Sequence, residues 1–439
     1  MINRSGIYQQ IIGISPLKAL QIFNISRQGS LILIAILLAQ FQLSTLQLGY
    51  YEQLLFLGYL LTFFWVSGLI QGLLSHYPSL TPEKQQRFIF NAFLLFSALA
   101  AVIFVIGYLG KSFLWTTILH QDNLPYYLLF LSYLCLNFPT CLVENYLLLQ
   151  KKGFQIVRYG ALAFSAQLLA MVVPIYLAWD FRFSFYGLIA VGLLKLLYLI
   201  YLLQGQAKWR LDMGMIRQWL QLSSPLILYA ILGGLLPAFD GWLVGFLYEG
   251  DEKMFAIFRY GAQELPLALA LTNAFSNVMV VEVAVDQTTA LRAIKQKSVQ
   301  LFHLLFPLSI LLMLVSDQLF PFLFNEDFIE SALVFRIYLL VIISRVIFSS
   351  TVLMGLKNNT IITQIGLLEL IVNIVCSYFL GRYYGVAGIA MGTLIAFSME
   401  KILQATYLYR KHQISLKEYL DFKWFFGYSI LLLIAFFLS

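Results

Sequence analysis

The stretches LLLQKKGFQIVRYG (147–160) and LMGLKNNTIITQIG (353–366) decide the predicted fold. Each contains the end of one apolar segment, a short basic turn and the start of another apolar segment. An offset of 206 residues aligns the two turns and places Lys151 opposite Lys357. The pattern predicts two related halves in one chain; chance similarity between apolar helices is the alternative.

A second pair of short stretches extends this repeat by one more helix. YGLIAVG (186–192) and AGIAMG (387–392) align Gly187 with Gly388, at an offset of 201. We therefore expect the loop before this helix to be five residues shorter in the second half. Six helices per half would keep both halves in the same orientation, and transporters often place the substrate site between such repeats.

The composition indicates a membrane protein. Of 439 residues, 61% are hydrophobic and only 11% are charged, whereas soluble domains carry about 25% charged residues. The three cysteines lack CxxC spacing and the four histidines are scattered, so we expect neither a metal site nor a cofactor. We also find no DxD-like pair and no long loop that would suggest a membrane glycosyltransferase.

Segments of about 20 apolar residues, the length needed to cross a bilayer, recur along the whole chain. They predict an all-α polytopic membrane protein with about 12–13 transmembrane helices, the last being the shortest. The domains expected are an N-terminal lobe 1–210, a C-terminal lobe 211–412 and an extra helix within 413–439. The spans are 15–40, 51–74, 87–110, 124–150, 154–178, 184–204, 217–248, 252–283, 299–323, 328–356, 360–381, 385–409 and 424–438.

The basic residues predict the orientation. With the N-terminus inside, eighteen of the 28 Lys and Arg lie on the inner face and four on the outer face. This asymmetry is typical of a cytoplasmic N-terminus. The net charge of +7 is thus explained by topology, and we expect no nucleic-acid partner.

Two longer stretches resemble a known family. SSPLILYAILGGLLPAFDGWLVGFLYEGDEKMFAIFRYGAQELPLAL (223–269) is similar to the seventh and eighth helices of polysaccharide flippases. VLMGLKNNTIITQIGLLELIVNIVCSYFLGRYYGVAGIAMGTLIA (352–396) is similar to their helices ten to twelve. The start of the eighth helix departs from the family, because Gly250-Asp-Glu stands where Gly-x-Tyr is usual. The matching residues are Pro225, Asp240, Gly250, Pro266, Asn373, Gly385, Gly388 and Ala390.

The resemblance is to the multidrug/oligosaccharidyl-lipid/polysaccharide flippase superfamily, in its O-antigen and polysaccharide exporter branch. It implies two six-helix lobes related by a pseudo-two-fold axis along the membrane normal, in the bacterial inner membrane. It implies a flippase that moves polyprenyl-pyrophosphate-linked oligosaccharides to the outer leaflet by alternating access. Membrane lipid, a coupling H⁺ or Na⁺, a polysaccharide polymerase and a chain-length regulator are the expected partners.

Six basic residues lie within the predicted spans, where a charge costs at least about 2.5–3.5 kcal/mol. A guanidinium binds phosphate oxygens bidentately, so we predict that Arg27, Arg259 and Arg345 bind the pyrophosphate. Lys195 and Lys401 are interpreted as structural. Further cavity or coupling residues are expected at Asn24, Gln28, Asp240, Glu264, Arg336 and Glu369, and sugar-stacking aromatics at Tyr50, Tyr51, Tyr229, Phe239 and Trp242.

Some of these residues have a second interpretation. Arg336 lies near an outer end, where it would pair with an outer carboxylate or extend to the surface. The deeper carboxylates would pair with arginines or bind coupling cations. A cation-coupled multidrug exporter of the same superfamily is the alternative function. Such exporters typically need an acidic residue in the first helix, and span 15–40 contains no Asp or Glu.

Overall fold

The computed structural model describes residues 15–439 except 42 and 206–207; the side chains of Pro225 and Tyr229 also lie outside the described part. All the regular secondary structure in this part is helical. The prediction of an all-α membrane protein is therefore confirmed.

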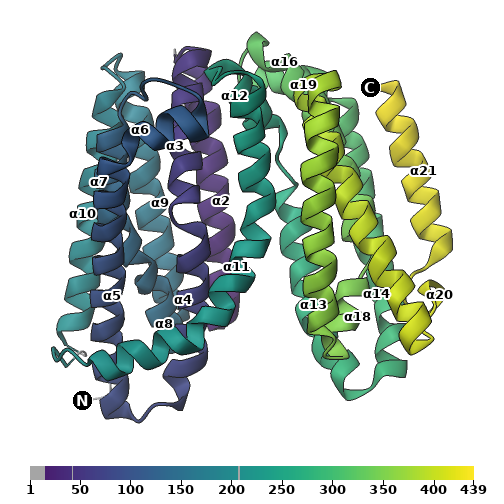
Figure 1. Cartoon of the computed structure of the whole chain (residues 1–439), viewed down its shortest axis with the longest axis horizontal. Helices are drawn as coiled ribbons and strands as arrows, with labels where there is room; N and C mark the ends of the chain where they lie inside the picture. Colours follow the sequence, from purple (N-terminus) through teal and green to yellow (C-terminus); the bar gives the residue numbers. More distant parts are fainter. Residues whose placement is uncertain (1–14, 42, 206–207) are drawn as a thin grey trace. The chain divides into compact units, whose positions relative to one another are not determined.

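The chain forms two compact units, Met1–Gly234 (unit 1) and Leu235–Ser439 (unit 2). The boundary falls inside one long helix, α11 (Met213–Leu247). Within each unit the long helices run side by side (Figure 1). The lobe limits 1–210, 211–412 and 413–439 stay predictions, as does the pseudo-two-fold axis.

Unit 1 begins with helices whose starts are encoded locally. Ser15 caps the first helix, ahead of Pro16, and Ser44 forms a capping box with Gln47. The elements are α2 (Pro16–Gln40), α3 (Thr45–Leu60), α4 (Phe63–His76), η1 (Tyr77–Ser79), α5 (Pro82–Leu109), α6 (Lys111–Phe113), η2 (Leu114–Leu119), α7 (Tyr127–Asn137), η3 (Phe138–Cys141), α8 (Leu142–Leu149), α9 (Gly153–Tyr176) and α10 (Arg182–Gln204).

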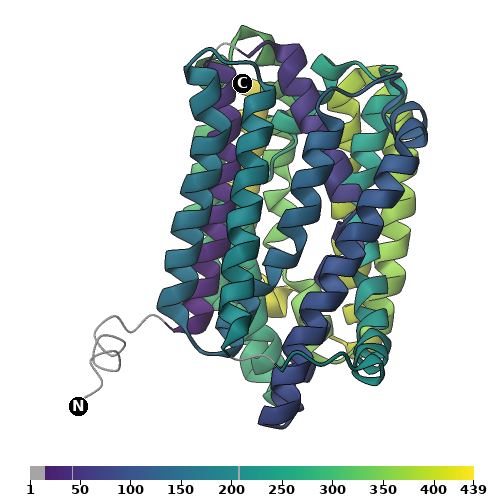
Figure 2. The same ribbon diagram turned by 90° about the vertical axis from the view of Figure 1, so that its left-hand side faces the viewer.

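The packing of unit 1 centres on α9. This helix packs against α2 and α10, and α10 packs against α7, on the side of unit 1 that Figure 2 presents. Gly160 on α9 leaves room for the ring of Phe23 on α2. Trp219, fully buried, contacts the rings of Phe88 and Phe96 on α5.

Unit 2, like unit 1, contains several interrupted helices. Its elements after α11 are α12 (Glu252–Gly261), α13 (Pro266–Val285), α14 (Gln287–Leu314), α15 (Ser316–Leu323), η4 (Glu326–Phe328), α16 (Ile329–Leu340), α17 (Ile342–Arg345), α18 (Ser349–Gly355), α19 (Asn359–His412), α20 (Leu416–Tyr419) and α21 (Phe422–Leu438).

Several of the predicted spans are interrupted in the structure, including span 51–74 between α3 and α4, span 124–150 at η3 and span 299–323 between α14 and α15. Span 252–283 divides into α12 and α13, because Pro266 begins α13 and restricts the residue before it. Span 328–356 bends by 42° between Arg345 and Ser349. Conversely, α19 covers spans 360–381 and 385–409, and Gly385 (φ +61°) forms the sharp break between its two arms.

Within the described residues, nine helices are long and apolar enough to cross a membrane, and the bent pair Glu326–Arg345 with Ser349–Gly355 would make a tenth. The stretches Gly234–Leu247 and Phe422–Leu438 are shorter apolar helices. Every span predicted from the sequence coincides with helix in the structure.

The aligned basic turns have the same backbone geometry. Lys151 (φ 56°) and Lys357 (φ 59°) both adopt the left-handed conformation. The N–H of Lys151 donates to the carbonyl of Leu148, and that of Lys357 donates to Met354. The following amides donate to residues 147 and 353 respectively, which completes a Schellman motif at both turns. This equivalence fits the predicted repeat.

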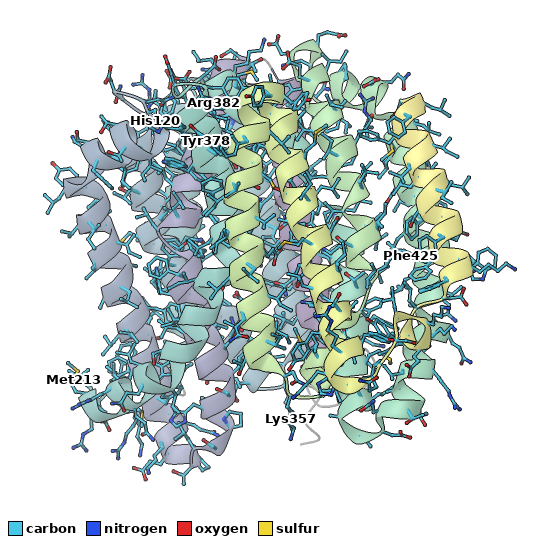
Figure 3. All side chains as sticks on the ribbon, turned by 45° about the vertical axis from the view of Figure 1, so that its right-hand side comes forward. His120, Met213, Lys357, Tyr378, Arg382 and Phe425 are labelled. Atoms are coloured by element: carbon cyan, nitrogen blue, oxygen red, sulfur yellow. The ribbon has the colours of Figure 1, made fainter. Side chains whose placement is uncertain are left out.

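The lengths of the next loops also differ as the alignment expects. In unit 1, residues 177–181 separate α9 from α10. In unit 2 the corresponding helices are the two arms of α19, which are joined at Gly385 without a loop. Figure 3 shows Lys357 and Arg382 at opposite ends of unit 2, and His120 and Met213 at opposite ends of unit 1. Which end faces the cytoplasm stays a prediction.

Candidate functional site

A cavity of about 310 Å³ lies inside unit 1. Helices α2, α3, α4, α7, α8, α9 and α10 contribute to it, together with η3. Most of its wall is apolar or aromatic, which is typical of a ligand site with a few orienting polar groups. Its polar and aromatic lining includes Arg27, Ser30, Tyr51, Tyr59, Tyr133, Asn137, Thr140, Glu144, Tyr159, Gln167 and Lys195.

The cavity carries more positive than negative charge. Arg27 comes from α2 and Lys195 from α10, whose ammonium donates a hydrogen bond to the Oδ1 atom of Asn137. Glu144, on α8, is buried and interacts electrostatically with both cations. Among the described residues, no carboxylate lies within ion-pair distance of Arg27 or Lys195. With all three groups charged, the cavity has a formal charge of +1.

The neighbours of Arg27 on α2 are oriented differently. Asn24, Arg27 and Gln28 are all exposed on this helix, but of these three only Arg27 lines the cavity, together with Ser30. Of the predicted aromatics, Tyr51 lines it. Lys195, which was interpreted as structural, and Glu144, which was not among the predicted site residues, both line this cavity; each interrupts an apolar span and so carried a usable signal.

Two of the predicted residues of unit 2 bind each other. The guanidinium of Arg345 donates from Nε to Glu264 Oε2 at 2.8 Å and from Nη2 to Glu264 Oε1 at 2.6 Å. It also lies 4.9 Å from the ring centre of Phe397. Glu264 lies at the break between α12 and α13, and Arg345 ends α17. The pair therefore ties two helix breaks together.

The other membrane arginines of unit 2 differ in environment. Arg336 donates to Asp317 Oδ1 at 2.8 Å and to the backbone carbonyl of Ser439 at 2.9 Å. It therefore pairs with a carboxylate, which was the alternative to a role in the cavity. Arg259, on α12, is partly buried. It interacts electrostatically with Tyr338 of α16, and Tyr338 also interacts electrostatically with Asp240 and Glu264.

Glu369 belongs to a group of charges further along unit 2. It is buried on α19 and interacts electrostatically with Glu400, Lys401 and Arg345. Lys401 pairs with Glu400 at 2.7 Å, and its ammonium approaches the hydroxyl of Ser350 at 3.4 Å. These contacts agree with the structural interpretation of Lys401.

Asp240 lies in a buried polar cluster with both arms of α19. Its Oδ2 atom accepts from the Thr393 hydroxyl at 2.8 Å, and the Asn373 amide donates to Thr393 at 3.1 Å and to Ser377 at 3.3 Å. Asp240 is 3% exposed and Asn373 is fully buried. The side chains of Asn373 and Tyr338 also interact with the Asp240 carboxylate, although within the described part of the chain no donor meets hydrogen-bond geometry at the Oδ1 atoms of Asp240 and Asn373. Such oxygens suit a cation or a proton.

Comparison with known proteins agrees with this architecture. A family model described as polysaccharide biosynthesis protein matches residues 37–333. Comparison with curated protein sequences gives no match.

Solved structures of similar fold were also found. The chain is similar to the lipid II flippase MurJ in an inward closed conformation, with a TM-score of 0.68, 15% identity and coverage of 95% of this chain and 91% of that one. An inward-facing multidrug resistance MATE transporter gives a TM-score of 0.65 and 13% identity, with 91% and 99% covered. A Pyrococcus furiosus transporter, described as having a binding pocket of reverse polarity, gives 0.60 and 12%, with 90% and 95% covered.

Proposed function

Because the chain belongs to the polysaccharide biosynthesis protein family, with the fold of the superfamily that includes MurJ and MATE transporters, we propose that it is a lipid-linked oligosaccharide flippase. It moves polyprenyl-pyrophosphate-linked repeat units, such as those of O-antigen, from the inner to the outer leaflet of the bacterial cytoplasmic membrane. Movement occurs by alternating access of two lobes, with the N-terminus in the cytoplasm.

The observation that carries this proposal is the positively charged cavity of unit 1. A pyrophosphate is a dense anion that loses its hydration on entering a membrane protein. Arg27 stays charged and offers a planar set of donors that matches phosphate oxygens, and Lys195 adds a second cation in the same cavity. The aromatic lining, which includes Tyr51 and Tyr133, provides flat surfaces for sugar rings.

The arginines of unit 2 act in the same transport cycle under this proposal. Arg345 is held by Glu264, so a phosphate must compete with this carboxylate to bind it. Arg259, which is partly buried on α12, supplies further positive charge. Arg336, paired with Asp317, has a structural role.

Ion coupling takes place at Asp240. Its buried Oδ1 atom and that of Asn373 meet no donor in hydrogen-bond geometry among the described residues, and binding of Na⁺ or H⁺ would satisfy them. Because both arms of α19 contribute to this cluster, occupancy can change how they pack. The flippase works with a polysaccharide polymerase and a chain-length regulator, which use the repeat units once they reach the outer leaflet.

The Arg27 side chain provides the test of this function. Flipping of a fluorescent polyprenyl-pyrophosphate oligosaccharide in proteoliposomes should fall at least about tenfold for Arg27→Ala, the loss expected from one hydrogen bond to a charged group. Arg27→Lys should retain part of the rate. The control is Arg182→Ala, which removes an exposed arginine paired with Asp180 and should flip at the wild-type rate. Equal rates for Arg27→Ala and wild type would refute the assignment.

A multidrug exporter is the alternative function. The MATE-like fold is compatible with it, but organic cations would meet two positive groups and one carboxylate in the cavity of unit 1. Drug susceptibility of an expressing strain separates the two functions, because only the exporter should raise resistance.

A further inference from the structure

A second and larger cavity of about 1000 Å³ lies between α9 and α10 of unit 1. This volume is at the upper end of the roughly 300–1,000 Å³ of small-molecule sites. Leu162, Ala166, Val191 and Leu194 form much of its apolar wall. The side chains of Leu162 and Leu194 are each 63% exposed. We call this space the α9–α10 groove.

The charged groups of the groove are all basic. Lys152, Arg158 and Lys195 line it, and its described lining contains no Asp or Glu. Lys152 and Arg158 lie at the start of α9, and the antiparallel α10 ends beside them at Gln204. Both residues belong to the predicted inner face. The groove therefore offers two cations at the inner surface of the membrane.

Lys195 lies deeper along the same groove. It precedes Gln204 by nine residues, which corresponds to about 14 Å along a helix and thus to about half of the roughly 30 Å hydrocarbon layer. Tyr159 and Leu162 of α9 and Tyr198, Tyr201 and Leu202 of α10 line the path between the two levels. A molecule with an anionic head and a long apolar tail fits this distribution of charge.

The groove adjoins the positively charged cavity. Tyr159, Ala163 and Lys195 line both spaces, so one wall separates them and Lys195 is part of that wall. Its ammonium donates to Asn137 on the cavity side. Arg27 lies in the lining of the same cavity. Cations thus continue from the membrane surface, through the wall, into the interior of unit 1.

We propose that the α9–α10 groove is the lateral entrance through which a polyprenyl pyrophosphate reaches the cavity from the inner leaflet. Lys152 and Arg158 receive the pyrophosphate, the polyprenyl chain lies against Leu162 and Leu194, and Lys195 passes the anion toward Arg27. This proposal rests on the proposed function and names the route of its substrate. A doubly charged pyrophosphate matches the two cations that receive it, Lys152 and Arg158, better than the single phosphate of an ordinary phospholipid.

The test uses substitutions at exposed positions that fill the groove and leave the buried side chains of unit 1 unchanged. Leu162→Trp and Leu194→Trp place a large side chain in it, and Leu169→Trp and Leu197→Trp change equally exposed positions of the same helices outside it. In proteoliposomes, a benzophenone-labelled polyprenyl pyrophosphate should cross-link to α9 and α10. Cross-linking and flipping should both fall about tenfold in the groove variants and stay unchanged in the two controls.

The Lys195→Met variant distinguishes binding of the lipid in the groove from its transfer into the cavity of unit 1. It should leave cross-linking at the groove within about twofold of wild type while reducing flipping about tenfold, because one charged hydrogen-bond donor is lost. Excess unlabelled polyprenyl pyrophosphate should abolish cross-linking, and excess phosphatidylglycerol should not. Equal competition by phosphatidylglycerol, or wild-type flipping in the groove variants, would overturn the route. Failure of the wild-type protein to flip any lipid-linked oligosaccharide would instead overturn the proposed function.

Discussion

The basic side chains inside the predicted membrane spans include some that form ion pairs and others that line a cavity. Arg336, Arg345 and Lys401 each form an ion pair, with Asp317, Glu264 and Glu400 respectively. Arg27 and Lys195 instead line a cavity. Because an uncompensated charge in the membrane is expensive, the cations that face a cavity are the ones best suited to a transported anion.

The Arg345–Glu264 pair is expected to behave as one unit. Glu264→Leu alone leaves the charge of Arg345 without its partner, and Arg345→Leu alone leaves that of Glu264. Both charges are partly buried, because the side chain of Arg345 is 31% exposed and that of Glu264 is 20% exposed in the intact pair. Each single variant should lower stability by about 2–3 kcal/mol, somewhat less than for a fully buried pair. The double variant should lose at least about 1 kcal/mol less than the sum. Thermal unfolding in detergent measures this, and additive losses would show that the two residues do not stabilise each other.

Asp240 is expected to couple flipping to an ion. Asp240→Asn removes the negative charge while keeping the shape that accepts from Thr393. Its flipping rate should no longer respond to an imposed Na⁺ or pH gradient, whichever drives the wild-type protein. Asp327→Asn, at an exposed pair with Lys253, should respond as wild type does. A full gradient response in Asp240→Asn would place the coupling site elsewhere.

The sequence could identify charged residues within spans, but it could not pair them. Glu264 and Arg345 are separated by 81 positions, and helical periodicity carries no information about contacts over that distance. A sequence shows only which residues share a face of one helix. The spacing of five residues therefore places Glu264 on a different face from Arg259, but it could not predict that Glu264 pairs with Arg345. Likewise, Lys195 lies beside Asn137, Glu144 and Arg27 only because α7, α8 and α2 bring these residues to it.

At the scale of elements, glycines allow the two arms of α19 to approach closely. A Cβ atom at Gly388 would collide with the backbone of Leu380 and Gly381. Backbone atoms cannot rotate away as a flexible side chain can. The close packing of these arms also holds Asn373 next to Thr393, so the polar cluster around Asp240 depends on small residues.

Gly388→Ala should therefore destabilise the protein by about 1–3 kcal/mol, the range for overpacking. Gly366→Ala on the same helix is the matched control, because a Cβ there meets no atom within 4 Å. It should be neutral or raise stability by up to about 1 kcal/mol through helix propensity. Unfolding midpoints of the two variants measured side by side decide this, and equal midpoints would contradict the close approach at Gly388.

Helix existence was predictable throughout, whereas the breaks were predictable in part. Pro266 and Gly385 are visible in the sequence, and the structure breaks at both. The bend between Arg345 and Ser349 follows no Pro or Gly, so local sequence did not indicate it. Its position next to the Arg345–Glu264 pair suggests that tertiary contacts set it.

At the scale of the whole molecule, the family and the cavity of unit 1 point to one kind of cargo. The chain belongs to a polysaccharide biosynthesis family, and its cavity presents two cations against one carboxylate. An anionic lipid-linked sugar as cargo agrees with both the family and the charge of the cavity. An organic cation as cargo agrees only with the similarity of fold to MATE transporters.

The most direct test measures both cargoes in the same proteoliposomes. We predict that the purified protein moves a polyprenyl-pyrophosphate oligosaccharide across the bilayer well above the rate in protein-free vesicles, and does not move a fluorescent organic cation. Transport of the organic cation, with the lipid-linked oligosaccharide remaining in its original leaflet, would contradict the account.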